Sequence, residues 1–122
     1  MTLDDIELIQ KRTNIRLPLC YIDIVTNYPV ELLETDAQDF GLLDDADELI
    51  EENNTVRKEG YFGEKWPEHY FIIGQNGCGD YYVTDINSTV FSVGFADHQS
   101  MSCNLYAEDL SEFIEKYTSE QE

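Results

Sequence analysis

Three short runs of aromatic and β-branched residues lie close together in the second half of the chain, and they constrain its fold more than any other feature. They span residues 69–74, 80–85 and 89–95, and glycine, asparagine or serine residues separate each run from the next. Runs of this composition with such breaks are typical of adjacent β-strands. The sequence therefore predicts a β-meander in this region.

Helical patterns flank the predicted meander on both sides. Thr2 opens a capping-box-like start to a first helix over residues 2–12. A second helix follows, with Pro18 at its first helical position and Pro29 beyond its end. The C-terminal stretch AEDLSEFIEKY places apolar residues at i, i+3, i+4 and i+7, the spacing of an amphipathic helix.

Between the second helix and the meander, the sequence predicts a short strand and a further helix. The stretch VELLE, residues 30–34, is strand-like in composition. A helix is predicted from about Asp44 to Asn54, with Leu49 and Ile50 facing inward and acidic side chains facing outward. Helices first, then adjacent strands and then a helix indicate an α+β fold.

The chain is strongly acidic for its length. It has 122 residues, with 26 Asp and Glu against 7 Lys and Arg, and a formal net charge of −19 at pH 7. Its hydrophobic fraction of 42% is enough for a folded core, so we expect a single domain over residues 1–122. The charge opposes binding to nucleic acid and to anionic membranes, and it favours a basic partner. Solubility alone is the alternative explanation of this charge.

Targeting and redox signals favour a cytoplasmic protein. No window approaches the ~20 apolar residues of a transmembrane helix, and the start MTLDDIELIQ lacks the features of a signal peptide. The three cysteines, Cys20, Cys78 and Cys103, have no C-x-x-C spacing, so we interpret them as reduced thiols.

The glycine-rich stretch GQNGCGD, residues 74–80, has the spacing of a phosphate-binding loop but the wrong chemistry. Asp80 stands where that loop needs a lysine, and Tyr82 stands where a dinucleotide fingerprint needs its third glycine. The dipeptide Asn76-Gly77 is common in tight turns, so the stretch is predicted to be a hairpin turn.

The sequence contains few candidates for catalysis. His69 and His98 are its only histidines, and neither has zinc-ligand spacing, so we expect no metal and no cofactor. An enzyme built around Cys78 and a histidine such as His69 is an alternative that requires the two side chains to be close. Carboxylates are too abundant to single out an acid–base pair. We therefore expect a protein without catalytic residues.

Ten carboxylates and no Lys or Arg lie between residues 31 and 52. Such a run is either a solvated face, with recognition on the sheet, or a surface where an opposite charge docks. We predict a partner-binding surface that combines acids of this run with an aromatic anchor from the following loop. Its candidate residues are Asp36, Asp39, Asp44, Asp45, Asp47, Glu48, Glu51 and Glu52, with Tyr61, Phe62 or Trp66 as the anchor.

The order of several residues over nearly the whole chain is similar to that of a known family. These residues are Leu17-Pro18, Tyr21, Leu49 to Asn53, Trp66, Ile73-Gly74, Gly77, Gly79, Asp80, Tyr82, Asp85 and Val90, followed by the C-terminal helix. In this order the chain resembles the SUKH superfamily, in particular its Smi/Knr branch. One departure is NYP at residues 27–29, where an Asn-Gly turn is expected after the second helix.

This resemblance implies a curved, mostly antiparallel sheet with helices packed against it, no catalytic residues, and a protein-binding function. Many bacterial members are immunity proteins that neutralise a toxin, often a nuclease, whereas other members are eukaryotic regulatory or adaptor proteins. The leading hypothesis is a cytoplasmic immunity protein that covers a basic, nuclease-type toxin without catalysis. A regulatory adaptor of the same fold is the alternative.

Overall fold

The described residues form five helices and four strands. Their order is the predicted one except that residues 30–34 were predicted as a strand and the fourth strand was not predicted. The computed structural model describes residues 1–88 and 90–120. Its elements are α1 (Leu3–Thr13), α2 (Leu19–Thr26), α3 (Val30–Leu33), α4 (Ala46–Glu59), β1 (Tyr70–Gln75), β2 (Tyr81–Asp85), β3 (Val93–Asp97), β4 (Ser102–Ala107) and α5 (Leu110–Glu120). The predicted single-domain α+β class is confirmed.

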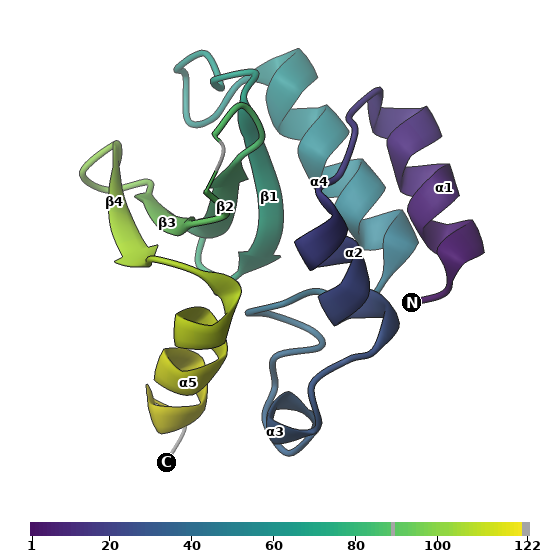
Figure 1. The fold of residues 1–122 in the computed structure, drawn as a ribbon. Coiled ribbons are helices and arrows are strands. Elements are labelled where there is room, and N and C mark those ends of the chain that lie inside the picture. The colour runs from purple at the N-terminus through teal and green to yellow at the C-terminus, as the bar shows by residue number, and fades with distance from the viewer. Residues whose placement is uncertain (89, 121–122) are drawn as a thin grey trace.

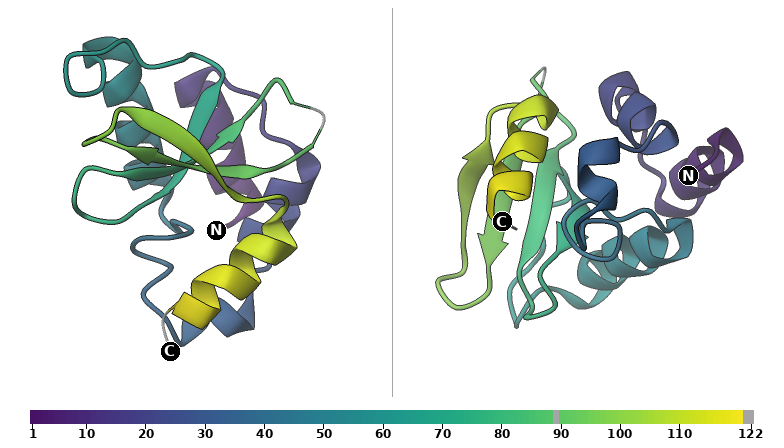
Figure 2. Two further views of the ribbon diagram at one scale, coloured as in Figure 1. Left: turned by 90° about the vertical axis from the view of Figure 1, so that its left-hand side faces the viewer. Right: turned by 90° about the horizontal axis from the view of Figure 1, so that it is seen from below.

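The four strands form one open antiparallel sheet in the order β1-β2-β3-β4. Figure 1 shows α4 beside β1, α1 on the outer side of α4, and α5 below β3 and β4. Seen from below, α1, α2, α3 and α4 gather on one side of the sheet (Figure 2). The predicted meander, with helices before and after it, is therefore present.

The two N-terminal helices agree with their predicted patterns. At α1 the Asp5 N–H donates to Thr2 Oγ1 at 3.2 Å and the Thr2 N–H donates to Asp5 Oδ2 at 2.9 Å, which confirms the capping box. Pro18 is the N-cap of α2 and not its first helical residue, so the helix begins at Leu19, one residue later than predicted. The helix ends at Thr26, ahead of Pro29.

The predicted strand at residues 30–34 is wrong, because this segment forms the helical turn α3. Pro29 precedes the turn in an extended conformation, and its carbonyl accepts a hydrogen bond from the Leu32 N–H at 3.0 Å. Leu32 is buried, while Val30 and Leu33 are exposed. Strand propensity is outweighed here because a proline with its fixed φ favours a helix start in the residues that follow it.

The middle helix is longer than predicted. Asp45 caps α4 by accepting a hydrogen bond from the Glu48 N–H at 3.2 Å, and the helix runs to Glu59 rather than to Asn54. Val56 is buried and extends the inward stripe beyond the predicted end. Residues 54–59 are mostly polar, so the apolar spacing that predicts a helix ends before the helix does.

The strand pattern missed β4 and placed the third strand too early. The third strand was predicted at residues 89–95 but β3 is Val93–Asp97, and Thr89 lies outside the described residues. β4 is an edge strand in which Cys103, Asn104 and Leu105 are exposed. An exposed edge strand lacks the apolar alternation on which strand prediction relies.

Successive residues of β1 contribute to two hydrophobic clusters. Phe71 and Ile73 belong to the larger cluster, which includes buried residues of α1, α2 and α5. Ile72 belongs to the smaller cluster with Val56, Tyr61, Trp66, Val83 and Ala96. This alternation is the two-residue period of a strand that is buried on both faces.

A side chain of α4 satisfies the backbone of β1 at Ile72. Asn53, with none of its surface exposed, donates from Nδ2 to Ile72 O at 3.1 Å and accepts the Ile72 N–H on Oδ1 at 2.8 Å. Its Nδ2 also donates to Leu49 O within α4 at 2.8 Å. The amide therefore takes the place of a neighbouring strand at this position and fixes α4 against the sheet.

The chain ahead of α4 covers the next part of the same edge. The Leu43 N–H donates to Ile73 O at 2.9 Å, and the Gln75 N–H donates to Phe40 O at 2.8 Å. A Cβ added at Gly74 would lie only 1.9 Å from Gly41 O, so the close approach of these two backbones requires a glycine.

Candidate protein-binding surface

The glycine-rich stretch is a hairpin turn between β1 and β2, as predicted. Gly77 and Gly79 have φ values of 80° and 98°, which favour glycine. Asn76 Oδ1 accepts the Cys78 N–H at 2.8 Å and the Asp80 N–H at 3.2 Å. The Asn76 side chain thus binds two backbone N–H groups of its own turn. The segment after the turn is the strand β2, whereas a phosphate-binding loop requires a helix there.

Asp80 joins this turn to the turn between β3 and β4. Its Oδ1 accepts the His98 N–H at 2.9 Å and lies 2.6 Å from His98 Nδ1, while Oδ2 accepts from Asn76 Nδ2 at 2.7 Å. Burial alone would raise the pKa of Asp80, but the hydrogen bonds from His98 and Asn76 lower it below its ordinary value. Asp97 lies beside them, so that ligand atoms of Asp80, Asp97 and His98 fall within 4.8 Å of one another.

This cluster was not anticipated from the sequence, because His98 stands 18 residues from Asp80 and no local spacing links them. Its contacts have a structural explanation: both oxygens of Asp80 are occupied by hydrogen bonds that hold the two turns together.

The alternative of a Cys78–His69 pair is wrong. His69 precedes β1 and Cys78 follows it, and a strand of six residues separates their positions by about 20 Å. The Cys78 thiol is exposed, and no hydrogen bond joins it to a base among the described residues. Among the described residues, the Cys78 thiol also makes no hydrogen bond to His98, whose Nδ1 lies 2.6 Å from Asp80 Oδ1.

Five acids of the predicted surface gather around α4. Burial first, and then the charges of Asp45, Glu52, Asp39 and Glu51, raise the pKa of Glu48 above its ordinary value. We call Asp39, Asp45, Glu48, Glu51 and Glu52 the acidic cluster. All five belong to the predicted set of surface acids, and Asp39 joins the other four from the segment before the helix.

Two side chains of the sheet fix acids of this cluster. Gln75 Nε2 donates to Glu48 Oε1 at 2.6 Å, and the Tyr81 hydroxyl donates to Glu52 Oε2 at 2.7 Å. The acidic cluster is therefore attached to the end of the sheet that carries the β1–β2 turn.

The remaining predicted acids have other surroundings. Asp44 is partly buried, with Oδ1 accepting from the Met1 ammonium at 2.8 Å and Oδ2 accepting from Gln38 Nε2 at 3.0 Å. Asp36 accepts from the Tyr117 hydroxyl of α5 at 2.6 Å. Asp47 is exposed in the first turn of α4. Asp44 and Asp36 thus connect distant parts of the chain.

Replacing Glu48 with glutamine is expected to stabilise the protein at neutral pH. The folded state binds the Glu48 proton more tightly than the unfolded chain, so the stability from this group is complete below its unfolded pKa and is lost as pH rises through its folded pKa. Glu48→Gln should raise the free energy of unfolding by less than about 1 kcal/mol and weaken its dependence on pH. Urea unfolding at neutral and mildly acidic pH measures both effects.

Glu7→Gln on α1 is the matched control, because Glu7 is exposed and lies outside the acidic cluster. Equal changes in the two variants would contradict a specific repulsion at Glu48.

The three predicted aromatic anchors have different exposures. Phe62 has 62% of its surface exposed and stacks on the His98 ring at 4.8 Å between centroids, whereas Tyr61 and Trp66 are buried. The Tyr61 hydroxyl donates to Gly79 O at 2.6 Å and to Ala96 O at 3.2 Å, which anchors the loop to the sheet. Phe62 is therefore the one of the three that protrudes.

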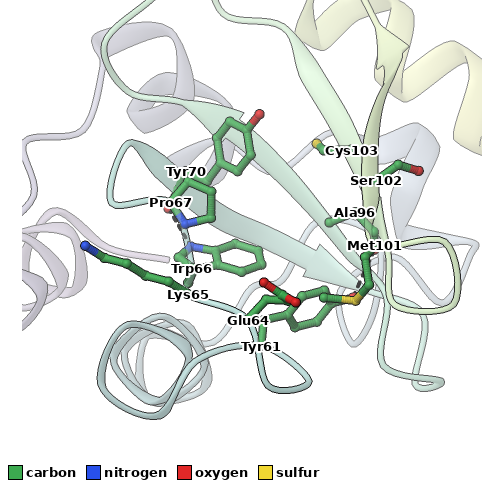
Figure 3. Close-up of a pocket in the computed structure, with 10 residues that line it drawn as sticks. All are labelled: Tyr61, Glu64, Lys65, Trp66, Pro67, Tyr70, Ala96, Met101, Ser102 and Cys103. Atoms are coloured by element: carbon green, nitrogen blue, oxygen red, sulfur yellow. Dashed lines mark hydrogen bonds between the residues drawn. The ribbon is translucent and has the colours of Figure 1, made fainter.

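Trp66 instead lines a pocket between this loop and the sheet, with a volume of about 270 Å³ (Figure 3). Its lining residues are Tyr61, Glu64, Lys65, Trp66, Pro67, Tyr70, Ala96, Met101, Ser102 and Cys103. We call this the aromatic pocket. Its residues from β4 and from the turn before it were not predicted, because that exposed edge strand has no distinctive sequence pattern.

Tyr81 connects the aromatic pocket with the acidic cluster. Its ring packs against Trp66 at 5.9 Å and against Tyr61 at 5.5 Å between centroids, while its hydroxyl reaches Glu52. Aromatic and acidic groups therefore adjoin at this end of the sheet, and such groups suit contact with a basic protein.

The fold and this surface define a small α+β protein that carries an acidic and aromatic face. The chain belongs to the SMI1 / KNR4 family (SUKH-1), whose family model matches residues 1–116. The family is in general a non-catalytic immunity or binding module, and membership is consistent with a toxin-immunity or protein-binding role.

Comparison with curated proteins found no match, and comparison with solved structures found none either. In the part of the chain that the structure describes, each helix is too short or too polar to span a membrane.

Proposed function

We propose that this protein is an immunity protein that binds a basic, nuclease-type toxin and neutralises it by covering its nucleic-acid-binding surface. The observation that carries the proposal is the junction at Tyr81, where the acidic cluster of α4 meets the aromatic pocket. Membership of the SMI1 / KNR4 family supports a partner of this class. The proposed site of action is the cytoplasm.

The charge of the chain supports this type of partner. A nuclease presents a cationic surface to nucleic acid, and a protein with a net charge of −19 is attracted to such a surface. Acids outside the partner's contact area accelerate association, while aromatic groups within it contribute most of the binding energy. Inhibition by occlusion requires no catalytic group on the immunity protein.

Co-expression tests the proposal. The protein is co-expressed with the toxin domain encoded immediately upstream of its own gene, and cell survival and co-purification are measured. We expect survival and a stable complex that weakens as salt concentration rises. A toxin domain with its catalytic residue removed is the control for co-purification, because it shows whether binding persists when toxicity is absent.

Failure of this protein to rescue the cells or to bind the toxin would contradict the proposal. It would then favour a regulatory adaptor of the same fold.

A further inference from the structure

We propose that the aromatic pocket receives an arginine side chain of the partner protein. The inference rests on the proposed function for the identity of that partner, but the pocket's preference for arginine follows from its own lining.

Fixed aromatic rings form the walls of the pocket. Trp66 meets Tyr61 edge-to-face at 5.2 Å and Tyr70 at 6.2 Å between ring centroids. The Trp66 indole N–H donates to Tyr70 O at 3.1 Å, so the indole has no free donor to offer a ligand. What remains is an aromatic surface, which attracts cations through the negative charge on the ring faces.

A carboxylate supplies the matching charge. Glu64 is exposed and lines the pocket, and among the described residues its carboxylate has no hydrogen-bond or ion-pair partner. The Glu64 backbone is held in place by hydrogen bonds with Tyr61, at 2.7 Å and 3.0 Å. In Figure 3 the Lys65 ammonium points away from the rings. The pocket therefore presents the unpaired carboxylate of Glu64, while the ammonium of the adjacent Lys65 points away from the rings.

More distant charges act in the same direction. Burial first, and then the charges of Asp80 and Asp97, raise the pKa of Tyr61 to about 12. Burial also raises the pKa of Tyr70, and Asp85 contributes to that increase. Asp80, Asp97 and Asp85 thus add negative charge near two of the rings, which disfavours an anionic occupant.

The shape and chemistry favour arginine over other side chains. A planar guanidinium stacks on an aromatic ring and pairs with a carboxylate through two parallel hydrogen bonds, and it is less strongly hydrated than an ammonium. A volume of about 270 Å³ accommodates a single side chain of this size. An apolar side chain would leave the carboxylate of Glu64 unpaired beside it.

The single tryptophan of the chain makes the pocket directly observable, because all tryptophan fluorescence and the one indole N–H signal come from Trp66. The probes are N-acetyl-L-arginine amide and its neutral isostere N-acetyl-L-citrulline amide. We expect arginine to shift both signals with a dissociation constant on the order of 1 mM, about tenfold tighter than citrulline.

Glu64→Gln tests the role of the carboxylate, with Glu68→Gln as a matched control, because Glu68 is exposed and does not line the pocket. We expect Glu64→Gln to weaken arginine binding about tenfold and Glu68→Gln to leave it unchanged. Equal responses to arginine and citrulline, or no response of Trp66 to arginine, would overturn the assignment.

The probe experiment and the toxin experiment fail independently. A toxin complex that forms normally without any arginine response would contradict the pocket assignment and leave the proposed function intact. An arginine response with no toxin complex would support the pocket assignment and contradict the proposed function.

Discussion

Replacing Asn53 with alanine is expected to lower the free energy of unfolding by about 3 kcal/mol. Asn53 is fully buried and makes hydrogen bonds to both backbone groups of Ile72 and to Leu49 O. Alanine leaves the Ile72 N–H and C=O buried without partners, and each such group costs about 1–3 kcal/mol. Urea unfolding monitored by circular dichroism measures the loss.

The neighbouring Asn54→Ala is the matched control for this prediction. Asn54 is exposed, and its side chain makes one hydrogen bond, to Arg12 O at 3.2 Å. Its replacement should cost less than about 1 kcal/mol. Similar losses in the two variants would show that Asn53 contributes only helix propensity, and would contradict its role as a substitute for a strand at the edge of β1.

Reversing charges in the acidic cluster is expected to slow association with the toxin about tenfold or more at low salt. The variant is Asp39→Lys with Glu51→Lys, two exposed acids whose side chains make no hydrogen bond among the described residues. Local charge near the contact surface steers diffusional encounter, so the change should appear in the association rate and fade at high salt. Stopped-flow mixing with a catalytically inactive toxin measures that rate.

The matched control places the same charge change elsewhere. Glu112→Lys with Glu115→Lys alters two exposed acids of α5, which packs against β4 rather than beside the acidic cluster. Both double variants have the same net charge, so a difference between them reports where the toxin approaches. Equal association rates for the two variants would contradict docking at the acidic cluster and leave only a general charge effect.

Much of the fold was predictable because most elements carry local signals. Thr2 and the pattern of α1, the glycines of the β1–β2 turn and the stripe of α5 each specify an element within a few residues. The failures occur where tertiary context decides. Pro29 and one buried leucine outweigh strand propensity in α3, and β4 forms at an exposed edge without a distinctive pattern.

The candidate site was predictable only as a group of residue types. The sequence placed Phe62 and Trp66 together as possible anchors, but it did not show that one protrudes and the other lines a pocket. It also grouped Asp44 with the exposed acids, although Asp44 binds the Met1 ammonium. The surroundings of these side chains depend on contacts between residues far apart in the sequence, such as the hydrogen bond from Tyr81 to Glu52. Contacts of this kind leave no local sequence pattern.

The proposed immunity function requires the protein to occupy the surface of the toxin that binds nucleic acid. The most direct measurement is a titration of the toxin's nuclease activity with this protein, together with a competition assay on labelled nucleic acid. We expect complete inhibition at a one-to-one ratio and displacement of the nucleic acid as the protein binds. A complex in which the toxin keeps its activity, or in which protein and nucleic acid are bound together, would contradict it.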